Sequence, residues 1–207
     1  MSDPRVRIVE AGYDEIGEDF AEWRNRILGD PRQWWLEQLT SRLPDGARVL
    51  ELGCGSGELE TRLLAERFRV TGVDVSREQI SRARANVPGA EFVQADFTAL
   101  DLEPASFEAV AAFYSFNHVP RDLLADVFGR IHSWLVPGAL YLASFGTSDT
   151  ESHVGEWLGA TMYFSSFPPR TTSRLLREAG FELLLDKIEC IVEPDGEGQF
   201  HWVLARR

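Results

Sequence analysis

The chain has 207 residues, which is enough for one sizeable hydrophobic core and too few for two ordinary enzyme domains. Hydrophobic residues make up 44% and charged residues 26%, and this balance excludes collagen-like, low-complexity and wholly disordered proteins. The 21 basic and 33 acidic residues give a net charge of −12, a sign that disfavours nucleic acid as a partner.

The sequence carries no signal for a membrane or for export. No stretch approaches the roughly 18 to 20 apolar residues of a membrane helix, and the amino terminus lacks the hydrophobic region of a signal peptide. Cys54 and Cys190 have no CxxC spacing and form no disulfide framework, which fits a reducing compartment. We therefore expect a cytoplasmic protein without a membrane partner, either a monomer or a homodimer.

Helical periodicity characterises the first 46 residues. Apolar side chains spaced by four, three and four predict an amphipathic helix over 12–29, and a second helix follows over 31–43. The sequence Pro-Asp-Gly at 44–46 ends it with turn chemistry. We expect residues 1–46 to form a helical cap on the domain.

From residue 47 onwards, short apolar strands alternate with helices, and the clearest of these helices spans 120–135. Such alternation predicts a parallel, doubly wound sheet with helices on both faces. After a last helix at 171–179, two strands follow without a helix between them, at 181–191 and 199–205, and predict an antiparallel hairpin. The expected fold is α/β: a seven-stranded, mostly parallel, Rossmann-like sheet with a terminal antiparallel strand. Its other strands are expected at 48–52, 68–73, 91–94, 107–113 and 139–145.

A glycine-rich loop follows the first predicted strand. Gly53, Gly55 and Gly57 stand at alternate positions, so the backbone can turn sharply and approach a ligand at a helix amino terminus. The dinucleotide fingerprint needs glycine where Glu58 stands, and that carboxylate would repel a pyrophosphate. The P-loop pattern also fails because no Lys-Ser/Thr pair follows. The loop therefore favours a nucleoside-like ligand that has no phosphate.

Two carboxylates end neighbouring predicted strands. Asp74 lies 21 residues after Gly53, where a carboxylate can accept hydrogen bonds from both hydroxyls of a ribose. Asp96, followed by Phe97, suits the amino group and ring face of an adenine. Asp74 could instead cap the next helix, although Ser76 already fits that role, and Asp96 could be an ordinary turn residue.

In this order, the motifs resemble those of the class I S-adenosylmethionine-dependent methyltransferases, and the resemblance covers essentially the whole chain. It is carried by Glu-Leu-Gly-Cys-Gly-Ser-Gly at 51–57, by the strand ends at 73–74 and 94–97, by Leu-Val-Pro-Gly at 135–138, and by the closing hairpin. The segment Tyr-Asp-Glu-Ile-Gly that begins at Tyr13 is similar to the amino-terminal segment of small-molecule members, although glycine replaces its usual alanine.

The resemblance implies S-adenosylmethionine as the cofactor. It assigns the glycine loop to the methionine portion, Glu51 to the ammonium group, Asp74 to the ribose, and Val75 with Asp96 to the adenine. The tyrosine at the amino-terminal segment would help to cover the cofactor. The expected cofactor-binding residues are Tyr13, Glu51, Gly53, Cys54, Gly55, Gly57, Asp74, Val75, Gln79, Asp96, Phe97 and Phe113.

The candidate catalytic residues, His118 and Tyr114, follow the fourth predicted strand. A histidine titrates near pH 7 and can take a proton from the acceptor, or its imidazole can simply brace the loop. The sequence at 113–118 departs from the Asp/Asn-Pro-Pro-Tyr signature of enzymes that methylate amino groups of nucleic acids. It also has no carboxylate where metal-dependent catechol-type enzymes place a magnesium ligand, so we expect no metal.

The stretch 146–169 is long and rich in aromatic residues, which favours a lid or a binding loop. The alternative is that its aromatic side chains pack on the body of the domain. Aromatic lining is typical of small-molecule pockets, and it suggests a flat, apolar acceptor. The candidate acceptor-binding residues are Trp23, Trp157, Met162, Tyr163 and Phe164.

We expect one domain over 1–207 that transfers a methyl group from S-adenosylmethionine to a small, partly apolar or aromatic acceptor without a metal. The nucleophile, whether oxygen, nitrogen, sulfur, carbon or halide, stays open. Two alternatives remain: a non-catalytic cofactor-binding partner subunit, and a nicotinamide-dependent oxidoreductase, which Glu58 and the terminal hairpin disfavour. The expected parts are the cap at 1–46, the cofactor-binding core at 47–146, the lid at 147–169, and the last helix and hairpin at 170–207.

Overall fold

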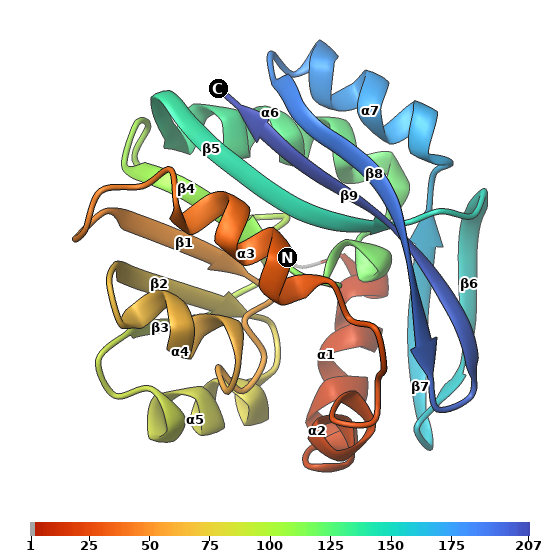
Figure 1. Cartoon of the computed structure of the whole chain (residues 1–207). Coiled ribbons are helices and arrows are strands. Elements are labelled where there is room, and N and C mark those ends of the chain that lie inside the picture. The colour runs from red at the N-terminus through yellow and green to blue at the C-terminus, as the bar shows by residue number, and fades with distance from the viewer. Residues whose placement is uncertain (1–2) are drawn as a thin grey trace.

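The computed structural model describes residues 3–207. Its centre is a seven-stranded sheet in the order β3-β2-β1-β4-β5-β9-β8, with helices on both faces (Figure 1). β9 runs antiparallel to β5 and β8, and the other pairs of neighbours are parallel. The expected fold, with its antiparallel last strand, is confirmed. The strands are β1 (Arg48–Leu52), β2 (Arg69–Asp74), β3 (Glu91–Gln94), β4 (Phe107–Ala112), β5 (Leu135–Gly146), β8 (Glu182–Glu193) and β9 (Gly196–Arg206).

Alternating side chains of the strands give the sheet one apolar core on each face. On one face, Tyr141 and Val203 pack with α6 and α7. On the other face, Leu142 and Trp202 pack with α3 and α4, and the indole of Trp35 stacks on Trp202 with ring centroids 5.5 Å apart. The helices are α3 (Arg32–Thr40), α4 (Glu60–Ala65), α5 (Arg77–Asn86), α6 (Leu124–Trp134) and α7 (Pro169–Glu178), with short 3-10 turns η1 (Phe116–His118) and η2 (Arg121–Leu123).

The amino-terminal helix differs from the expected one. The apolar stripe at 12–29 predicts one helix, whereas the structure has α1 (Pro4–Ile16) and α2 (Asp19–Arg24). Gly17 separates them: its φ of 52° is left-handed, and its N–H donates to the carbonyl of Tyr13, which ends α1. α1 begins earlier than expected because the Asp3 side chain caps it and Pro4 occupies its first turn.

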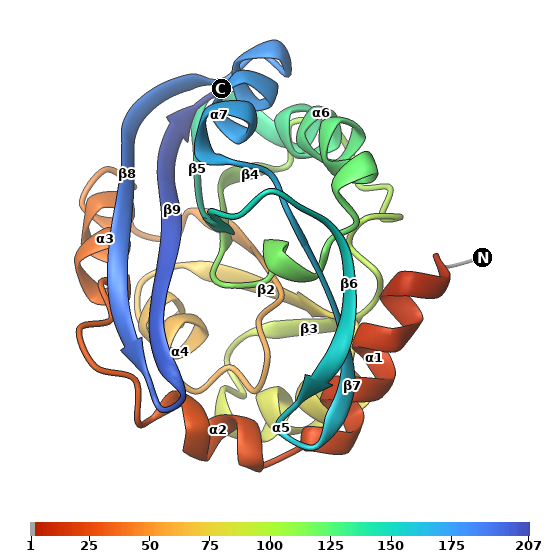
Figure 2. The ribbon, with the colours of Figure 1, turned by 90° about the vertical axis from the view of Figure 1, so that its right-hand side faces the viewer.

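The segment expected as a long loop is a two-stranded antiparallel hairpin, β6 (Thr150–Trp157) and β7 (Ala160–Ser166). Its turn consists of Leu158 and Gly159, both with positive φ, which is the geometry that closes tight hairpins. The sequence does not predict this turn, because a leucine rarely occupies its first position. The hairpin lies beside α1 and faces the β8–β9 hairpin across the molecule (Figure 2).

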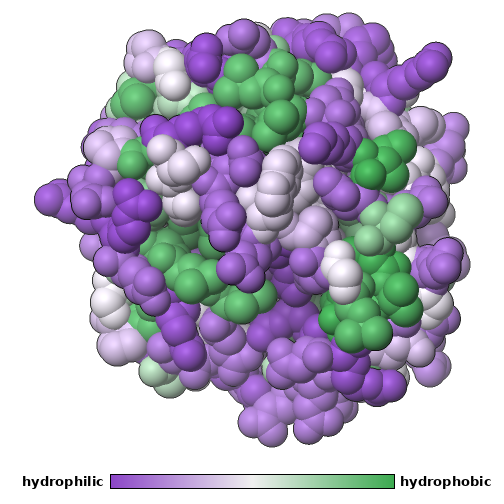
Figure 3. Space-filling model, viewed as in Figure 1, coloured by the Kyte–Doolittle hydropathy of each residue, from purple (hydrophilic) through white to green (hydrophobic). Residues whose placement is uncertain are grey.

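The order of the strands places a crevice at the carboxyl ends of β1 and β4. The chain runs outward from β1 to β3 and then returns to β4, and such a reversal leaves room for a ligand at that edge. The surface seen in Figure 3 is mainly hydrophilic, and its hydrophobic patches are separate from one another. Within residues 3–207, no helix is both long enough and apolar enough to cross a membrane.

Candidate active site

A cavity of about 370 Å³ lies at the carboxyl ends of the central strands. Its walls come from the strand ends, from α1 and α2, and from both hairpins. Most of the residues singled out in the sequence meet there. Those in its lining are Tyr13, Trp23, Glu51, Gly53, Cys54, Gly55, Asp74, Val75, Asp96, Phe97, Phe113, Tyr114, His118, Trp157 and Phe164.

The glycine loop brings the backbone close to the cavity. A Cβ atom on Gly53 would lie 2.4 Å from the Cβ of Ser115, so only glycine lets β1 and β4 end side by side. A Cβ atom on Gly55 would approach only the Gln79 side chain, at 3.9 Å, so this part of the loop faces open space. The backbone therefore forms a cradle that a ligand can fill.

Asp74 is buried at the end of β2, and its carboxylate accepts hydrogen bonds from backbone N–H groups. Oδ2 accepts from the N–H of Gly55 at 2.8 Å, and Oδ1 accepts from the N–H of Ser76 at 2.9 Å. Burial raises the pKa of Asp74, while these backbone N–H groups oppose the rise. The residue also lines the cavity, where a diol could donate to its carboxylate. Ser76, not Asp74, caps α5, because its Oγ accepts from the N–H of Gln79.

Asp96 follows β3, where it forms a turn and also lines the cavity. Its Oδ1 accepts hydrogen bonds from the N–H and the hydroxyl of Thr98, at 2.9 and 2.6 Å, which is turn geometry. The residue also lines the cavity beside Phe97 and Val75. An adenine would therefore meet a carboxylate and apolar side chains in this part of the cavity.

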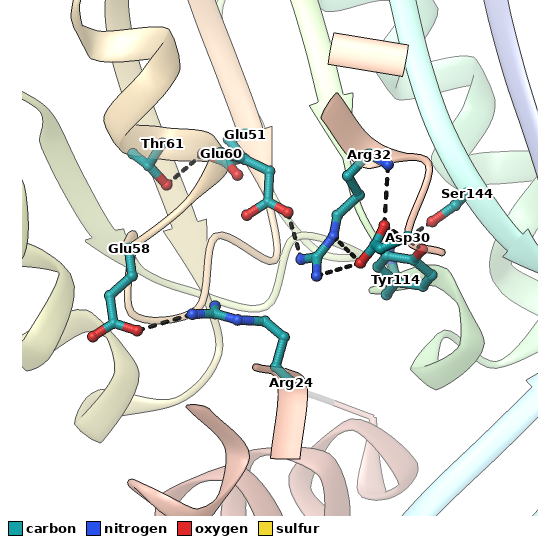
Figure 4. A network of polar contacts seen from close by, with 9 residues as sticks. All are labelled: Arg24, Asp30, Arg32, Glu51, Glu58, Glu60, Thr61, Tyr114 and Ser144. Atoms are coloured by element: carbon teal, nitrogen blue, oxygen red, sulfur yellow. Dashed lines mark hydrogen bonds and ion pairs between the residues drawn. The ribbon is translucent and has the colours of Figure 1, made fainter. Parts of the chain in front are cut away.

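Glu51 extends from β1 into the cavity and is 2% exposed. Its Oε2 accepts a hydrogen bond from the Thr61 hydroxyl at 2.6 Å (Figure 4). Burial raises the pKa of Glu51 to about 8, and the negative charge of Glu60 adds to the rise. This carboxyl is suited to a cationic group, because an ammonium ion would offset the cost of its ionisation.

A network of buried charges, which the sequence analysis did not single out, forms a second polar wall (Figure 4). Arg32 donates to Asp30 at 2.6 Å and to Glu60 at 2.5 Å, and its guanidinium lies over the ring of Tyr114. Arg24 from α2 pairs with Glu58 at 2.9 Å. Such pairs join the cap to the glycine-loop region, and no local pattern in the sequence announces them.

Tyr114 lies just after β4 and has a φ of 55°, an uncommon conformation for a residue with a side chain. Its N–H donates to the Ser144 hydroxyl at 2.7 Å, and its own hydroxyl donates to Asp30 at 3.0 Å. Burial and the charge of Asp30 raise the pKa of Tyr114 well above its usual range. The ring therefore forms a wall of the cavity, while the hydroxyl is committed to the charged network.

His118 is buried and held at both ring nitrogens. Nδ1 lies 2.8 Å from the carbonyl oxygen of Tyr163, and Nε2 lies 3.0 Å from the hydroxyl of Tyr13. A carbonyl only accepts, so Nδ1 carries the hydrogen and Nε2 accepts from Tyr13. Burial lowers the pKa of His118 to about 4, which keeps the imidazole neutral. The ring thus braces β7 and also faces the cavity.

Aromatic rings from α2 and the β6–β7 hairpin form part of the cavity wall. The rings of Trp23 and Trp157 have centroids 5.1 Å apart, and Trp157 also contacts Tyr13 and Phe164 edge-on. The ring of Phe200 on β9 contacts that of Tyr114, with centroids 4.6 Å apart. Further lining residues not singled out from the sequence are Arg24, Ile27, Arg32, Glu60, Thr98, Asn117, Ile191, Glu193 and Asp195.

Four of the expected site residues lie outside the lining. Met162 and Tyr163 are fully buried with α1, where Met162 approaches Gly12, so their side chains belong to the core. Gly57 faces α5, and a Cβ atom there would touch Ala83 and Val87 at 3.4 Å. The amide of Gln79 donates to a backbone carbonyl of the cap.

Comparisons with known proteins bear on this arrangement. A family model described as a methyltransferase domain matches residues 49–138. The match covers the predicted cofactor-binding core and agrees with the resemblance to the class I S-adenosylmethionine-dependent methyltransferases. This confirms the resemblance seen in the sequence and, with it, the expected cofactor. The methyltransferase relative YqeM of Bacillus subtilis is 35% identical over 133 residues, covering 61% of this chain and 54% of its own length.

Other relatives extend the comparison. The ubiquinone biosynthesis O-methyltransferase of Xylella fastidiosa is 34% identical over 161 residues, covering 66% of this chain and 64% of that protein. The chain spans only 60% and 54% of the lengths of its Geobacillus and Bacillus relatives. Among solved structures, the 1,6-didemethyltoxoflavin-N1-methyltransferase of Burkholderia thailandensis superposes with a TM-score of 0.75 at 21% identity, covering 100% of this chain and 91% of that chain, and it supports the fold.

Proposed function

We propose that this chain transfers a methyl group from S-adenosylmethionine to a small organic acceptor within the single cavity described above. The observation that carries the proposal is the continuity of that cavity. The glycine cradle and the carboxylates at the strand ends lie at one end of it, and aromatic rings of α2 and both hairpins lie at the other. A donor and an acceptor could therefore meet without crossing solvent.

The residues at the strand ends fit the cofactor, which when bound supplies a methyl group on a positively charged sulfur. Asp74 lines the cavity with a carboxylate that the two ribose hydroxyls could donate to. Glu51 offers a buried carboxyl to the ammonium group, and Gly55 leaves the space that the methionine portion needs. Val75, Asp96 and the neighbouring ring of Phe97 form a site for the adenine.

The acceptor region favours a small, flat, partly apolar molecule. Trp23, Trp157 and Phe164 present ring faces and edges, and Phe200 narrows the cavity from the other side. These rings would shield the region of transfer from water and hold the acceptor in line with the methyl group. Relatives named for small molecules, among them trans-aconitate and rifamycin methyltransferases, agree with an acceptor of this size. Metal independence, the absence of a nucleic-acid partner and a cytoplasmic location stay predictions.

Binding and turnover test the proposal together. In calorimetry, S-adenosylhomocysteine should bind to the purified chain, and NADH should not. A panel of hydroxyl, amine and thiol compounds, assayed for release of S-adenosylhomocysteine, should then contain acceptors that are methylated. Tight cofactor binding without turnover in the whole panel would favour the non-catalytic partner subunit. Binding of NADH in place of the cofactor would contradict the proposal.

A further inference from the structure

The contact between Tyr13 and His118 joins α1 to the turn after β4 inside the cavity. The Tyr13 hydroxyl lies 3.0 Å from Nε2 of His118, and Nδ1 of His118 lies 2.8 Å from the Tyr163 carbonyl oxygen. The carbonyl fixes the hydrogen on Nδ1, so Tyr13 donates its only hydrogen to Nε2. A chain of two hydrogen bonds therefore runs from the cavity to β7.

The direction of this chain leaves one basic atom open to an acceptor. The lone pair of Nε2 is already used by the Tyr13 hydroxyl, and the imidazole is buried behind it. The Tyr13 oxygen has donated its hydrogen and keeps its lone pairs, and Tyr13 is less buried than His118. Tyr114, the other tyrosine of the cavity, has its hydroxyl bound to Asp30 instead.

We propose that the Tyr13 hydroxyl takes the proton of the methyl acceptor and passes its own proton to His118. This rests on the proposed methyl transfer. The acceptor's lone pair forms the new bond to the methyl carbon, and the electrons of the broken carbon–sulfur bond stay on sulfur. The acceptor's proton moves to the Tyr13 oxygen, and the former Tyr13 proton moves to Nε2 of His118 and later to solvent.

The surroundings of the pair make a coupled shift easier than ionisation of either group alone. Burial and the negative charge of Asp74 raise the pKa of Tyr13 above its usual range, so a free phenolate is disfavoured. Burial also lowers the pKa of His118 to about 4. Within residues 3–207, rings of Tyr13, Trp157 and Phe164 surround the imidazole, and its polar partners are the Tyr13 hydroxyl and the Tyr163 carbonyl. That carbonyl would stabilise the imidazolium as the positive charge leaves the sulfur.

This proton path defines the class of acceptor. A hydroxyl or an N–H group loses a proton when it is methylated and needs a base at the point of attack. A thiolate or a halide loses none and gains nothing from the pair. We therefore assign the site to a protic oxygen or nitrogen nucleophile, held with its proton toward Tyr13.

Removal of one oxygen atom tests the assignment. Tyr13→Phe keeps the ring, and should lower kcat by about 100-fold with the best hydroxyl or amine acceptor of the panel, while the Kd of S-adenosylhomocysteine changes by less than about threefold. His118→Asn should lower kcat to a similar level, and the double variant should be no slower than the slower single variant. Tyr141→Phe removes a buried hydroxyl of β5 outside the cavity and should leave kcat unchanged.

Nitrogen NMR of histidine-labelled protein gives a readout that does not depend on turnover. His118 should show the tautomer with hydrogen on Nδ1, and Tyr13→Phe should shift only the Nε2 signal, toward that of a nitrogen without a donor. Hydrogen on Nε2 in the wild type, or a kcat of Tyr13→Phe within threefold of wild type, would overturn the relay. Such results would leave the proposed function standing if methylation persists. Cofactor binding without any methylation would remove that function even if the tautomer is as expected, and the relay with it.

Discussion

The two halves of the cavity are built in different ways. In the cofactor half, Asp74 accepts hydrogen bonds from the N–H groups of Gly55 and Ser76. These residues follow β1 and β2, two neighbouring strands that are close in the sequence. In the acceptor half, Tyr13 meets His118 across 105 positions of the chain, and Trp157 reaches Trp23 from a separate hairpin. The first half depends on backbone geometry that short motifs encode. The second depends on packing between segments that are far apart in sequence.

This difference predicts where substitutions act. Backbone groups and buried carboxylates hold the cofactor half, so a change there should affect both stability and cofactor affinity. Ring contacts dominate the acceptor half, and each ring contributes a modest packing energy. Changes there should affect acceptor use before they affect the fold. The following predictions are ordered from the largest expected effect to the smallest.

The largest effect is expected at the glycine loop. Gly53→Ala would place a Cβ atom 2.4 Å from that of Ser115 at a φ of 75°, so β1 and β4 would have to separate. We expect the free energy of unfolding to fall by about 3 kcal/mol or more and cofactor binding to be lost in calorimetry. Gly138→Ala is the matched control, because its φ is 80° and no atom lies within 4 Å. It should cost only about 1 kcal/mol. Equal losses in both variants would show that conformation alone, and not close approach, determines the loop.

The next effect is expected at the carboxylate that ends β2. Asp74→Ala removes the acceptor proposed for both ribose hydroxyls and should weaken cofactor binding by about 1.5–3 kcal/mol, the range for charged hydrogen bonds. Asp101→Ala, at an exposed aspartate outside the cavity lining, controls for the loss of one negative charge. Unchanged affinity in a folded Asp74→Ala protein would remove this residue from the cofactor site.

The difference between the two halves also determines how much of the fold and of the site could be predicted from the sequence. The strand order, the glycine loop and the carboxylates at the strand ends follow from local patterns, because a strand, its turn and the next helix are contiguous. The burial of Tyr163 and the role of Arg32 depend on which segments α1 and α3 meet, and no local pattern specifies that. The β6–β7 hairpin was hidden because Leu158 occupies a left-handed position that favours Gly, Asn or Asp.

The pH dependence of stability has opposite signs for one titratable group in each half of the cavity. Glu51, in the cofactor half, has a pKa of about 8 in the folded protein against about 4.5 for the free side chain. The folded state therefore binds an extra proton between these values, and stability falls as pH rises through the window. His118, in the acceptor half, has a folded pKa of about 4 against 6.5, so its contribution rises with pH between 4 and 6.5.

Above pH 6.5 only the Glu51 contribution of these two remains. Chemical denaturation from pH 6.5 to 8 should show wild-type stability falling by up to about 1.4 kcal/mol per pH unit relative to Glu51→Gln, since one proton is released. Between pH 4.5 and 6.5 the contributions of Glu51 and His118 oppose each other. In His118→Asn the stability should therefore fall with rising pH over this range, because only the Glu51 contribution is left. Parallel curves for wild type and Glu51→Gln above pH 6.5 would mean that Glu51 is already ionised in the folded protein.

The smallest effect is expected at the aromatic wall. Trp157→Ala removes a ring that contacts Tyr13, Trp23 and Phe164, and should raise the KM for the acceptor by about tenfold, about 1.4 kcal/mol, with cofactor affinity nearly unchanged. Val154→Ala, at a half-exposed side chain of the same hairpin outside the cavity lining, should change neither constant. Equal losses of stability and of both affinities in Trp157→Ala would show that the ring is core, not a wall of the acceptor region.

A crystal structure of the chain with S-adenosylhomocysteine tests the division of the cavity most directly. The ribose should lie within hydrogen-bond distance of both Asp74 oxygens, and the sulfur should face the space between Tyr13 and Tyr114. The region enclosed by Trp23, Trp157 and Phe200 should stay free for the acceptor. A nucleoside seated among these rings, or bound outside the cavity, would contradict the account.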